Sequence, residues 1–147
     1  MKVGIVGHAE NKFTMVTRSR AMHVMVALLS NPGDVLVSGH CHLGGIDIWA
    51  EELADALGMP KIIHVPATHN WSDGYKPRNL LIAHDCDEIH VIVVDKYPSG
   101  YSGMTFDSCY HCNTNTHVKS GGCWTAKQVQ LLGKPAYWHI IDGGLNE

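Results

Sequence analysis

The chain has 147 residues, of which 45% are hydrophobic and 17% charged, with a formal net charge of −3. This length and composition predict one folded domain with a real core and exclude an intrinsically disordered chain. The small negative charge and the lack of a long basic run argue against a broad nucleic-acid-binding face. No stretch of about 18 apolar residues is present, so we expect no membrane span. The start of the chain resembles a strand rather than an export signal, and five cysteines fit a disulfide framework poorly, so we expect a cytoplasmic protein.

Short apolar runs predict strands, and apolar positions at helical spacing predict helices that glycine or proline ends. In chain order we expect a strand at 3–6, a helix at 18–30, a strand at 35–37, a helix at 45–57, a strand at 61–65, a polar and aromatic loop at 66–76, a helix at 77–84, a strand at 88–94, an irregular segment at 95–119, a helix at 123–132, a strand at 136–141 and a tail at 142–147.

Five strands that alternate with four helices predict a single α/β domain over residues 1–147. Because the strands are apolar on both faces, they belong in a mainly parallel five-stranded sheet that helices cover on each side. Right-handed crossovers then give a Rossmann-like three-layer sandwich. Ligands of such sheets bind at the carboxyl ends of the strands. Gly7 and His8 follow the first strand, so we expect them at that edge and near the ligand.

Two glycine-rich turns each precede a predicted helix. The first covers 38–47, Ser-Gly-His-Cys-His-Leu-Gly-Gly-Ile-Asp, and the second begins with Ser-Gly-Gly at 120–122. Glycine lets a backbone approach a ligand closely, and a helix N-terminus offers free N–H groups with a partial positive charge. Such a turn suits a phosphate, and two of them favour a nucleotide held between them. The alternative is that the glycines only shape tight turns.

Side chains near these turns have the chemistry of a nucleotide site. Asp47 lies in the first turn of its helix. We expect it to accept a hydrogen bond from a ribose hydroxyl or to act as a base that orients a water, and the alternative is that it only stabilises the helix start. Arg78 offers a planar fork for phosphate, and Trp71 or Tyr75 can stack on a base. The alternative for these three is a surface salt bridge beside two loop aromatics.

The second turn can also contact a phosphate through side chains. Gly121 and Gly122 offer backbone N–H groups, and Thr125 offers a hydroxyl, unless Thr125 only caps its own helix. Lys96 and Lys119 flank the same edge and add positive charge.

The first turn carries His40, Cys41 and His42, and we expect His8 and His69 along the same edge. Three such ligands would suit a catalytic zinc, and a neutral histidine would suit a general base. The alternative is that these are polar loop residues that contact water.

Four residues in and beside the irregular segment have the spacing of a structural zinc site: Cys109, Cys112, His117 and Cys123. Cys-x2-Cys is the usual half of such a site, and the whole pattern differs from a zinc knuckle by one residue. The segment at 95–119 is also long for a compact domain without a stabiliser. His111 is an alternative ligand, and Asp107 would replace Cys123 if that residue is not one. The competing hypothesis is a set of reduced thiols without a metal.

In their order and spacing, these motifs resemble the SLOG superfamily, and within it the YAcAr-type branch. The residues that match are Ser38, Gly39, Gly45 and Asp47 in the first turn, Trp71, Arg78 and Asn79 in the middle, and Ser120, Gly121, Gly122 and Thr125 in the second turn. The resemblance covers about residues 1–142, outside the segment 95–116. It implies a Rossmann-like fold and a nucleotide or nucleotide-derived ligand, which these residues and Gly44 would contact.

One position departs from a branch of that superfamily, the LOG phosphoribohydrolases. Their second turn is followed by a glutamate that acts on the N-glycosidic bond, and Gln128 stands at that position here. Glutamine cannot exchange a proton near neutral pH, so we expect a nucleotide-binding or sensing protein. The alternative is a hydrolase of N-glycosidic or phosphoester bonds in which Asp47, His40 or His42 replaces the glutamate. A third hypothesis is a module that docks a partner through the Cys/His loop. Family analogy and apolar helix stripes also predict a homo-oligomer.

Overall fold

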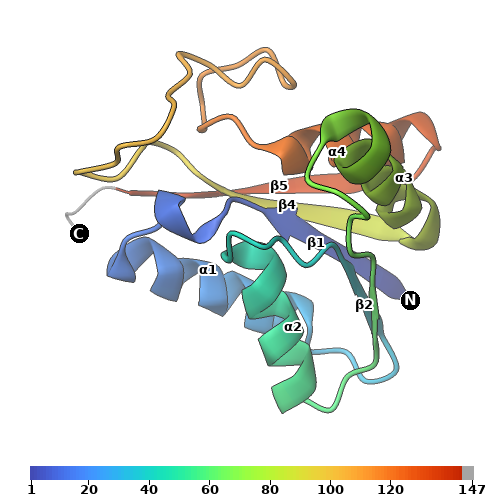
Figure 1. Ribbon diagram of the computed structural model, residues 1–147. Helices are drawn as coiled ribbons and strands as arrows, with labels where there is room; N and C mark the ends of the chain where they lie inside the picture. The colour runs from blue at the N-terminus through green and yellow to red at the C-terminus, as the bar shows by residue number, and fades with distance from the viewer. Residues whose placement is uncertain (144–147) are drawn as a thin grey trace.

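The computed structural model describes residues 1–143, and residues 144–147, the end of the tail predicted at 142–147, lie outside the described residues. Five strands form one sheet in which all neighbours are parallel, as the sequence predicts. They are β1 (Lys2–Gly7), β2 (Val35–Ser38), β3 (Lys61–Ile63), β4 (Glu88–Val94) and β5 (Ala136–Ile141). Their order across the sheet is β3-β2-β1-β4-β5, the order of a Rossmann-like fold (Figure 1).

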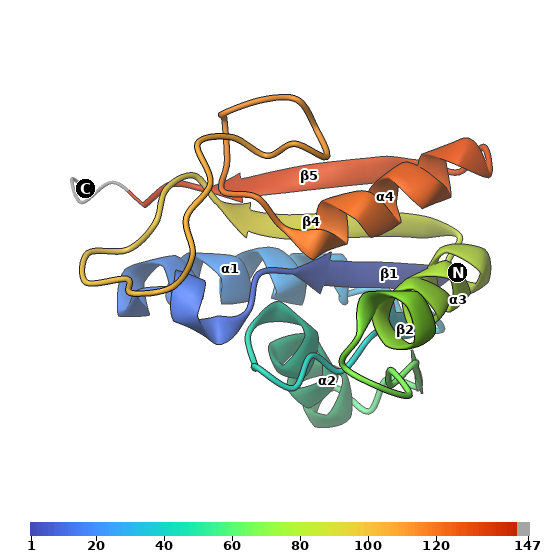
Figure 2. The ribbon, with the colours of Figure 1, turned by 45° about the horizontal axis from the view of Figure 1, so that its top comes forward.

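Four α-helices cover the sheet within residues 1–143. They are α1 (Met15–Leu28), α2 (Ile46–Ala56), α3 (Lys76–Asp85) and α4 (Gly121–Leu131). The pair α1 and α2 packs on one face of the sheet and the pair α3 and α4 on the other, so the domain has the predicted three layers (Figures 1 and 2). None of the helices in this range combines the length and the apolar character needed to cross a bilayer.

Strand β4 shows why the strands are apolar on both faces. Ile89, Val91 and Val93 lie in the core between the sheet and α3 and α4, whereas Ile92 and Val94 lie in the core between the sheet and α1 and α2. Successive side chains of a strand point to opposite faces, so a strand that helices cover on both sides needs apolar residues throughout.

Helix α1 begins at Met15 rather than at the predicted Arg18, and the reason is a capping box. The Thr14 hydroxyl accepts a hydrogen bond from the Thr17 N–H at 3.1 Å, and the Thr17 hydroxyl accepts one from the Thr14 N–H at 2.8 Å. Two backbone donors of the helix start are thereby satisfied. Threonine here takes the place that glutamate or glutamine usually holds, so the pattern is easily overlooked in the sequence.

The loop predicted at 66–76 contains one turn of π-helix, η2 (Trp71–Tyr75), which runs directly into α3. Gly74 makes this turn feasible, because a Cβ there would lie 2.0 Å from the carbonyl oxygen of Thr68. The turn brings Trp71 and Tyr75 to the edge of the sheet where the strands end.

The connections of the sheet change direction between β1 and β4. β1 leads through α1 to β2 on one side, whereas β4 leads to β5 on the other, so a crevice forms beyond the carboxyl ends of β1 and β4. The segment 95–119 is irregular, as predicted, apart from a bridge between Cys109 and Thr114. Figures 1 and 2 show this segment projecting from the end of the sheet where β4 and β5 finish. We call it the insert.

Candidate functional site

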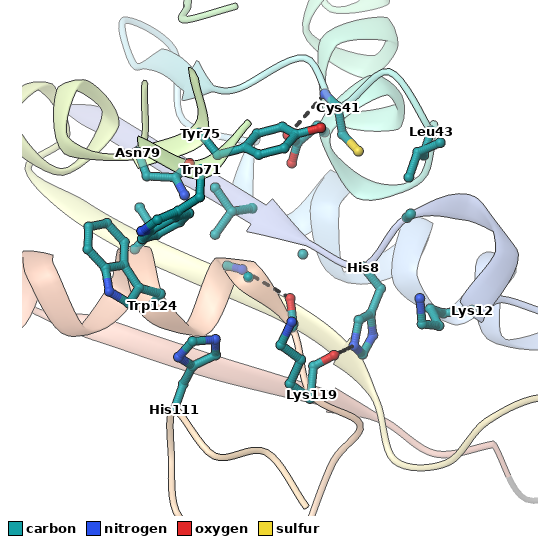
Figure 3. A pocket seen from close by; sticks show the side chains of 18 of the residues that line it. His8, Lys12, Cys41, Leu43, Trp71, Tyr75, Asn79, His111, Lys119 and Trp124 are labelled. Carbon is teal, nitrogen blue, oxygen red and sulfur yellow. Dashed lines mark hydrogen bonds between the residues drawn. The ribbon is translucent and has the colours of Figure 1, made fainter. Parts of the chain in front are cut away.

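A cleft of about 640 Å³ lies beyond the carboxyl ends of β1 and β4, at the place that the fold predicts for a ligand. Four parts of the chain form it: the end of β1 with the short 3-10 helix η1 (Glu10–Lys12), the first glycine turn with the start of α2, η2 with α3, and the insert with the start of α4. Figure 3 shows side chains from all four parts around the cleft. Ten residues predicted to bind a ligand line it: Gly7, His8, Asp47, Trp71, Arg78, Asn79, Ser120, Gly121, Gly122 and Thr125.

The second glycine turn forms the start of α4 itself, because the helix begins at Gly121 rather than at the predicted Cys123. Ser120 is the N-cap, and its hydroxyl accepts a hydrogen bond from the Gly122 N–H at 3.1 Å. A Cβ at Gly121 would meet no heavy atom within 4 Å, so this part of the turn borders open space. The helix start can therefore present the Gly121 N–H and the positive end of its dipole to an anion.

The glycines of the first turn allow two loops to pack closely. A Cβ at Gly45 would lie 2.3 Å from the carbonyl oxygen of His8, and Gly45 has a φ of +87° that other residues rarely adopt. A Cβ at Gly44 would come within 2.8 Å of the Glu10 carboxylate. The turn thus supports the loop that follows β1.

Four residues predicted for the ligand site lie outside the lining of the cleft: Ser38, Gly39, Gly44 and Gly45. Ser38 is buried, and its hydroxyl donates to the carbonyl oxygen of Ile5 at 2.7 Å. The Gly39 carbonyl accepts a hydrogen bond from the Arg78 guanidinium. The first turn reaches the cleft instead through the segment 41–43 and through Asp47.

The imidazole ring of His8, in the loop after β1, contacts the backbone at the end of β4 and at the end of the insert. Its Nδ1 accepts a hydrogen bond from the Val94 N–H at 3.1 Å, so Nε2 carries the proton. Nε2 lies 3.1 Å from the carbonyl oxygens of both Val118 and Lys119. Burial lowers the pKa of His8 to about 3, so the ring is neutral. Because both nitrogens bind backbone groups, a ligand in the cleft can contact only ring carbons, and the ring can serve neither as a base nor as a metal ligand.

Asp47 is a buried carboxyl at the edge of the cleft. Its Oδ2 accepts a hydrogen bond from the Cys41 N–H at 3.2 Å. Burial raises its pKa to about 6, and the positive charge of Arg78 partly opposes this rise. A carboxyl with this pKa can gain or lose a proton near neutral pH, so it has the property required of a general acid or base.

Arg78 is held at the cleft by neutral partners. Its guanidinium donates to the Gly39 carbonyl and, through Nε, to the Asn79 Oδ1 at 2.6 Å. The same group lies over the ring of Tyr75, 5.6 Å from its centroid. None of these contacts neutralises the guanidinium, so its positive charge remains available to an anion.

The cleft is positively charged and aromatic. Among the described residues, its lining has three basic side chains, Lys12, Arg78 and Lys119, and one carboxyl, Asp47. This surplus of positive charge occurs in a chain whose net charge is −3. Six aromatic rings accompany it: Trp71, Tyr75, Tyr97, Phe106, Tyr110 and Trp124.

The sequence interpretation missed part of this lining. It named Lys119 but not Lys12, and it placed Lys96 at this edge, although Lys96 lies outside the lining. The insert contributes Phe106 and other aromatic residues that the sequence did not connect with the site. The only available signal was the high content of aromatic residues in the insert, which alone does not indicate where they point.

The histidines of the first turn do not gather into a metal site. His40 Nδ1 lies 2.8 Å from the carboxylate of Glu51, and the His42 ring stacks on His69 with centroids 3.8 Å apart. The structure therefore gives no support to a catalytic zinc on this turn. Among residues 1–143, a single group of three or more possible metal ligands has its ligand atoms close together, and it lies elsewhere.

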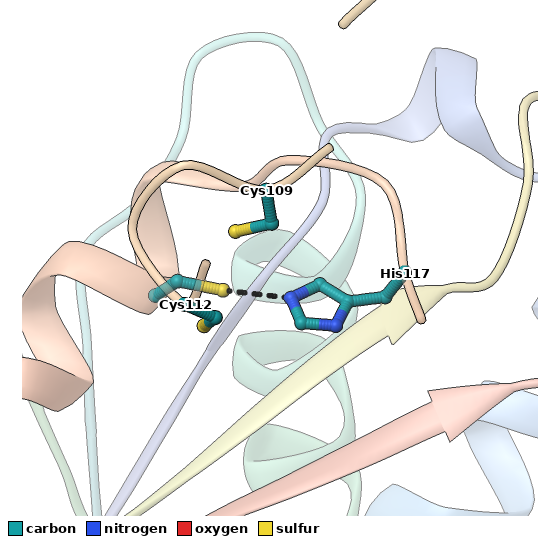
Figure 4. Close-up of side chains that lie close together, drawn as sticks. Cys109, Cys112 and His117 are labelled. Carbon is teal, nitrogen blue, oxygen red and sulfur yellow. Dashed lines mark hydrogen bonds between the residues drawn. The ribbon is translucent and has the colours of Figure 1, made fainter. Parts of the chain in front are cut away.

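That group consists of the four residues predicted for zinc: Cys109, Cys112, His117 and Cys123. Their ligand atoms all lie within 4.8 Å of one another, and Figure 4 shows the side chains converging. With Zn–S bonds of about 2.3 Å and Zn–N bonds of about 2.1 Å, tetrahedral ligands lie roughly 3.5–3.8 Å apart. The distance of 3.5 Å between Cys123 Sγ and His117 Nε2 has this value. The cluster can therefore hold a metal ion, and Cys123 takes part in it, so neither His111 nor Asp107 is needed.

The surroundings of the cluster suit a metal as well. His117 Nδ1 lies 3.1 Å from the Thr116 hydroxyl, which leaves Nε2 for the ion. Burial lowers the pKa of His117, so its ring is neutral, as a ligand must be. Burial raises the pKa of Cys123, so a cation is needed to stabilise its thiolate. The Trp138 N–H also donates to this sulfur at 3.4 Å.

Comparison with protein-family models, curated proteins and solved structures finds no match to this chain. A functional proposal for this chain is therefore based mainly on the chemistry of the cleft and of the Cys/His cluster.

Proposed function

We propose that the chain binds a nucleotide or nucleotide-derived small molecule in the cleft, as a binding or sensing protein. The observation that carries this proposal is the combination, in one cleft, of an open helix N-terminus with an excess of positive charge and exposed aromatic rings. A nucleotide offers the matching groups, since it joins an anionic phosphate to a flat base. The sequence motifs that resemble the SLOG superfamily imply the same ligand class.

The parts of the ligand would meet different walls of the cleft. A phosphate would accept the Gly121 N–H at the positive end of α4 and would be attracted by Arg78. The ribose hydroxyls would lie near Asp47. The base would stack near Trp71 and Trp124, whose rings meet edge to face with centroids 4.8 Å apart. Asn79 lies on the same side of the cleft in Figure 3 and offers an amide for a base edge.

The experiment that tests this proposal uses Gly121→Asp. The new side chain has room, and a carboxylate is favoured at a helix N-terminus, so the fold should keep its stability. The same carboxylate would repel a phosphate, and we expect nucleotide affinity to fall by about 100-fold or more. Calorimetric titration with a panel of purine and pyrimidine nucleotides measures this loss.

Gly121→Ala is the matched control, because it adds a side chain without charge, and we expect it to keep the affinity within about threefold. Native mass spectrometry of the wild-type protein, compared with the denatured mass, would identify a ligand that copurifies. If no nucleotide in the panel binds, or if Gly121→Asp binds as tightly as the wild type, the proposal is wrong.

We further propose that the ion in the Cys/His cluster is zinc, in a structural role. Three thiolates and one imidazole are a donor set typical of structural zinc, and four protein ligands leave no position for a substrate. The ion would join three ligands on the insert to Cys123 on α4. Elemental analysis of protein purified without chelator should give about one zinc per chain, and a protein without metal would contradict the proposal.

A second candidate function is hydrolysis of an N-glycosidic or phosphoester bond of the bound nucleotide. The buried Asp47 favours it, because a pKa of about 6 suits a group that exchanges protons. Release of free base or phosphate from the nucleotide panel would establish turnover, and Asp47→Asn should then abolish it while retaining binding. A wild-type protein that binds nucleotides without releasing either product would exclude this candidate.

A further inference from the structure

Two lysines at the cleft rest on aromatic rings of the insert. The ammonium nitrogen of Lys119 lies 5.0 Å from the ring centroid of Phe106 and 5.4 Å from that of Tyr110. The ammonium nitrogen of Lys12 lies 5.1 Å from the ring centroid of Tyr101. An aromatic face holds a cation in place without neutralising it.

Neither lysine forms a salt bridge with a carboxylate among the described residues. Within residues 1–143, the Lys12 ammonium group makes one hydrogen bond, a long one of 3.3 Å to the amide oxygen of Asn11. Lys61, at the start of the edge strand β3, forms the salt bridge that is common for a surface lysine: its ammonium nitrogen lies 2.9 Å from a carboxylate oxygen of Asp55. The two positive charges at the cleft are therefore available to an anion from solution.

The backbones that carry these lysines are both anchored beside the end of β1. The Lys119 carbonyl oxygen lies 3.1 Å from His8 Nε2, and the Lys12 N–H donates to the carbonyl of Ala9 at 3.2 Å. Lys119 also directly precedes Ser120, the N-cap of α4. Figure 3 shows Lys12 on the opposite side of the cleft from Trp71 and Trp124, with Lys119 pointing into the cleft between them.

This arrangement places the two lysines away from the two tryptophans in the cleft, with the start of α4 beside Lys119. We propose that Lys12 and Lys119 form a second phosphate subsite, so that the ligand contains a diphosphate rather than a single phosphate. This inference rests on the proposed nucleotide binding. The first phosphate lies at Gly121, and the next phosphate lies between the two ammonium groups. Nucleoside diphosphates and nucleotides with a longer or substituted diphosphate have this chemistry.

The test compares nucleoside monophosphates with the diphosphates of the same base, by calorimetric titration at physiological salt and without magnesium. We expect each diphosphate to bind about tenfold tighter or better than its monophosphate, because two charge-assisted contacts are added. Lys12→Met and Lys119→Met keep an apolar stem on the aromatic rings and remove the charge. In each variant the ratio of the two affinities should fall toward one.

Lys96→Met is the matched control, since Lys96 belongs to the same insert but lies outside the lining of the cleft. We expect it to leave the ratio unchanged, and circular dichroism should show that all three variants are folded. A wild-type protein that binds mono- and diphosphates equally well would overturn the second subsite while leaving nucleotide binding intact. A lysine variant that keeps the full ratio would overturn it too. If no nucleotide binds at all, the proposed function itself is wrong.

Discussion

The two glycine-rich turns are alike in sequence, yet the structure gives them different tasks. Each follows a serine and leads into a helix, and from the sequence both could hold a phosphate. In the first turn the glycine before the helix, Gly45, has backbone atoms of the neighbouring loop against it. In the second turn the first residue of the helix, Gly121, borders open space. The comparison teaches that a glycine at the start of a helix serves either close packing or ligand access, and that only its three-dimensional neighbours distinguish the two.

The largest expected effect comes from giving both glycines the same small side chain. Gly45→Ala combines a positive φ with a Cβ 2.3 Å from a carbonyl oxygen, so we expect a loss of stability of about 5 kcal/mol, enough to prevent folding. Gly121→Ala should change the stability by less than about 1 kcal/mol. Urea denaturation followed by circular dichroism measures both. Equal effects of the two substitutions would mean that the turns do not differ in this way.

Cys123 lies in the first turn of α4, and the other three ligands of its cluster lie on the insert. A bound metal would therefore connect the second glycine turn to the insert, and removal of another ligand tests this connection. Cys112→Ser should eliminate bound metal and lower the Tm by about 5–10 °C. It should also weaken nucleotide binding, because the insert supplies Phe106, His111 and Lys119 to the cleft. Elemental analysis, thermal denaturation and calorimetric titration measure these effects. Cys86→Ser is a suitable control thiol, since Cys86 is buried away from the cluster; it should keep the metal.

The loop that packs on the first turn contains His8, and acid should loosen it. The pKa of His8 is lowered to about 3 from 6.5, so its contribution to stability is full above pH 6.5 and falls as the pH drops. Between pH 6.5 and pH 5 this amounts to about 2 kcal/mol. His8→Asn should be less stable than the wild type at pH 7 but should lose less stability over this interval. Urea denaturation at several pH values tests this, and parallel curves for the two proteins would refute it.

The smallest effect concerns Asp47, the contribution of the first turn to the cleft. Its pKa is raised to about 6 from 3.8, so ionisation costs stability as the pH rises through this interval. Asp47→Asn keeps an acceptor for the Cys41 N–H and removes the charge. Relative to the wild type, the variant should therefore gain about 1 kcal/mol of stability between pH 5 and pH 6. A difference in Tm that does not depend on pH would show that Asp47 is not held in this state.

The sequence predicted the architecture well because burial decides it. Apolar runs placed all five strands, and alternation with helices predicted a parallel three-layer domain. Helix starts were less accurate where side chains determine them, as at Thr14 and Thr17. The π-helical turn of η2 depends on the contact of Gly74 with the Thr68 backbone, which no local pattern indicates.

The candidate site was predicted unevenly for a similar reason. The spacing of the four metal ligands is a local property of the chain, and all four converge. The lining of the cleft depends on how the insert folds back over the sheet, so the position of Lys12 beside insert aromatics was not predictable. The two nitrogens of His8 are engaged by strands and loops far apart in sequence, which also cannot be recognised from the residue type alone.

The pairing of β1 with β4 has a consequence for the way the protein is made. β1 is the central strand, and Val3 pairs with Leu36 on one side and with Glu88 on the other. During synthesis β2 can cover the first edge early, but the second edge stays bare until β4 has left the ribosome. Through that interval an apolar strand has unpaired N–H and C=O groups along one edge. Such an edge can pair with strands of other chains and so promote aggregation. The protein should therefore be most prone to aggregation while it is still being translated.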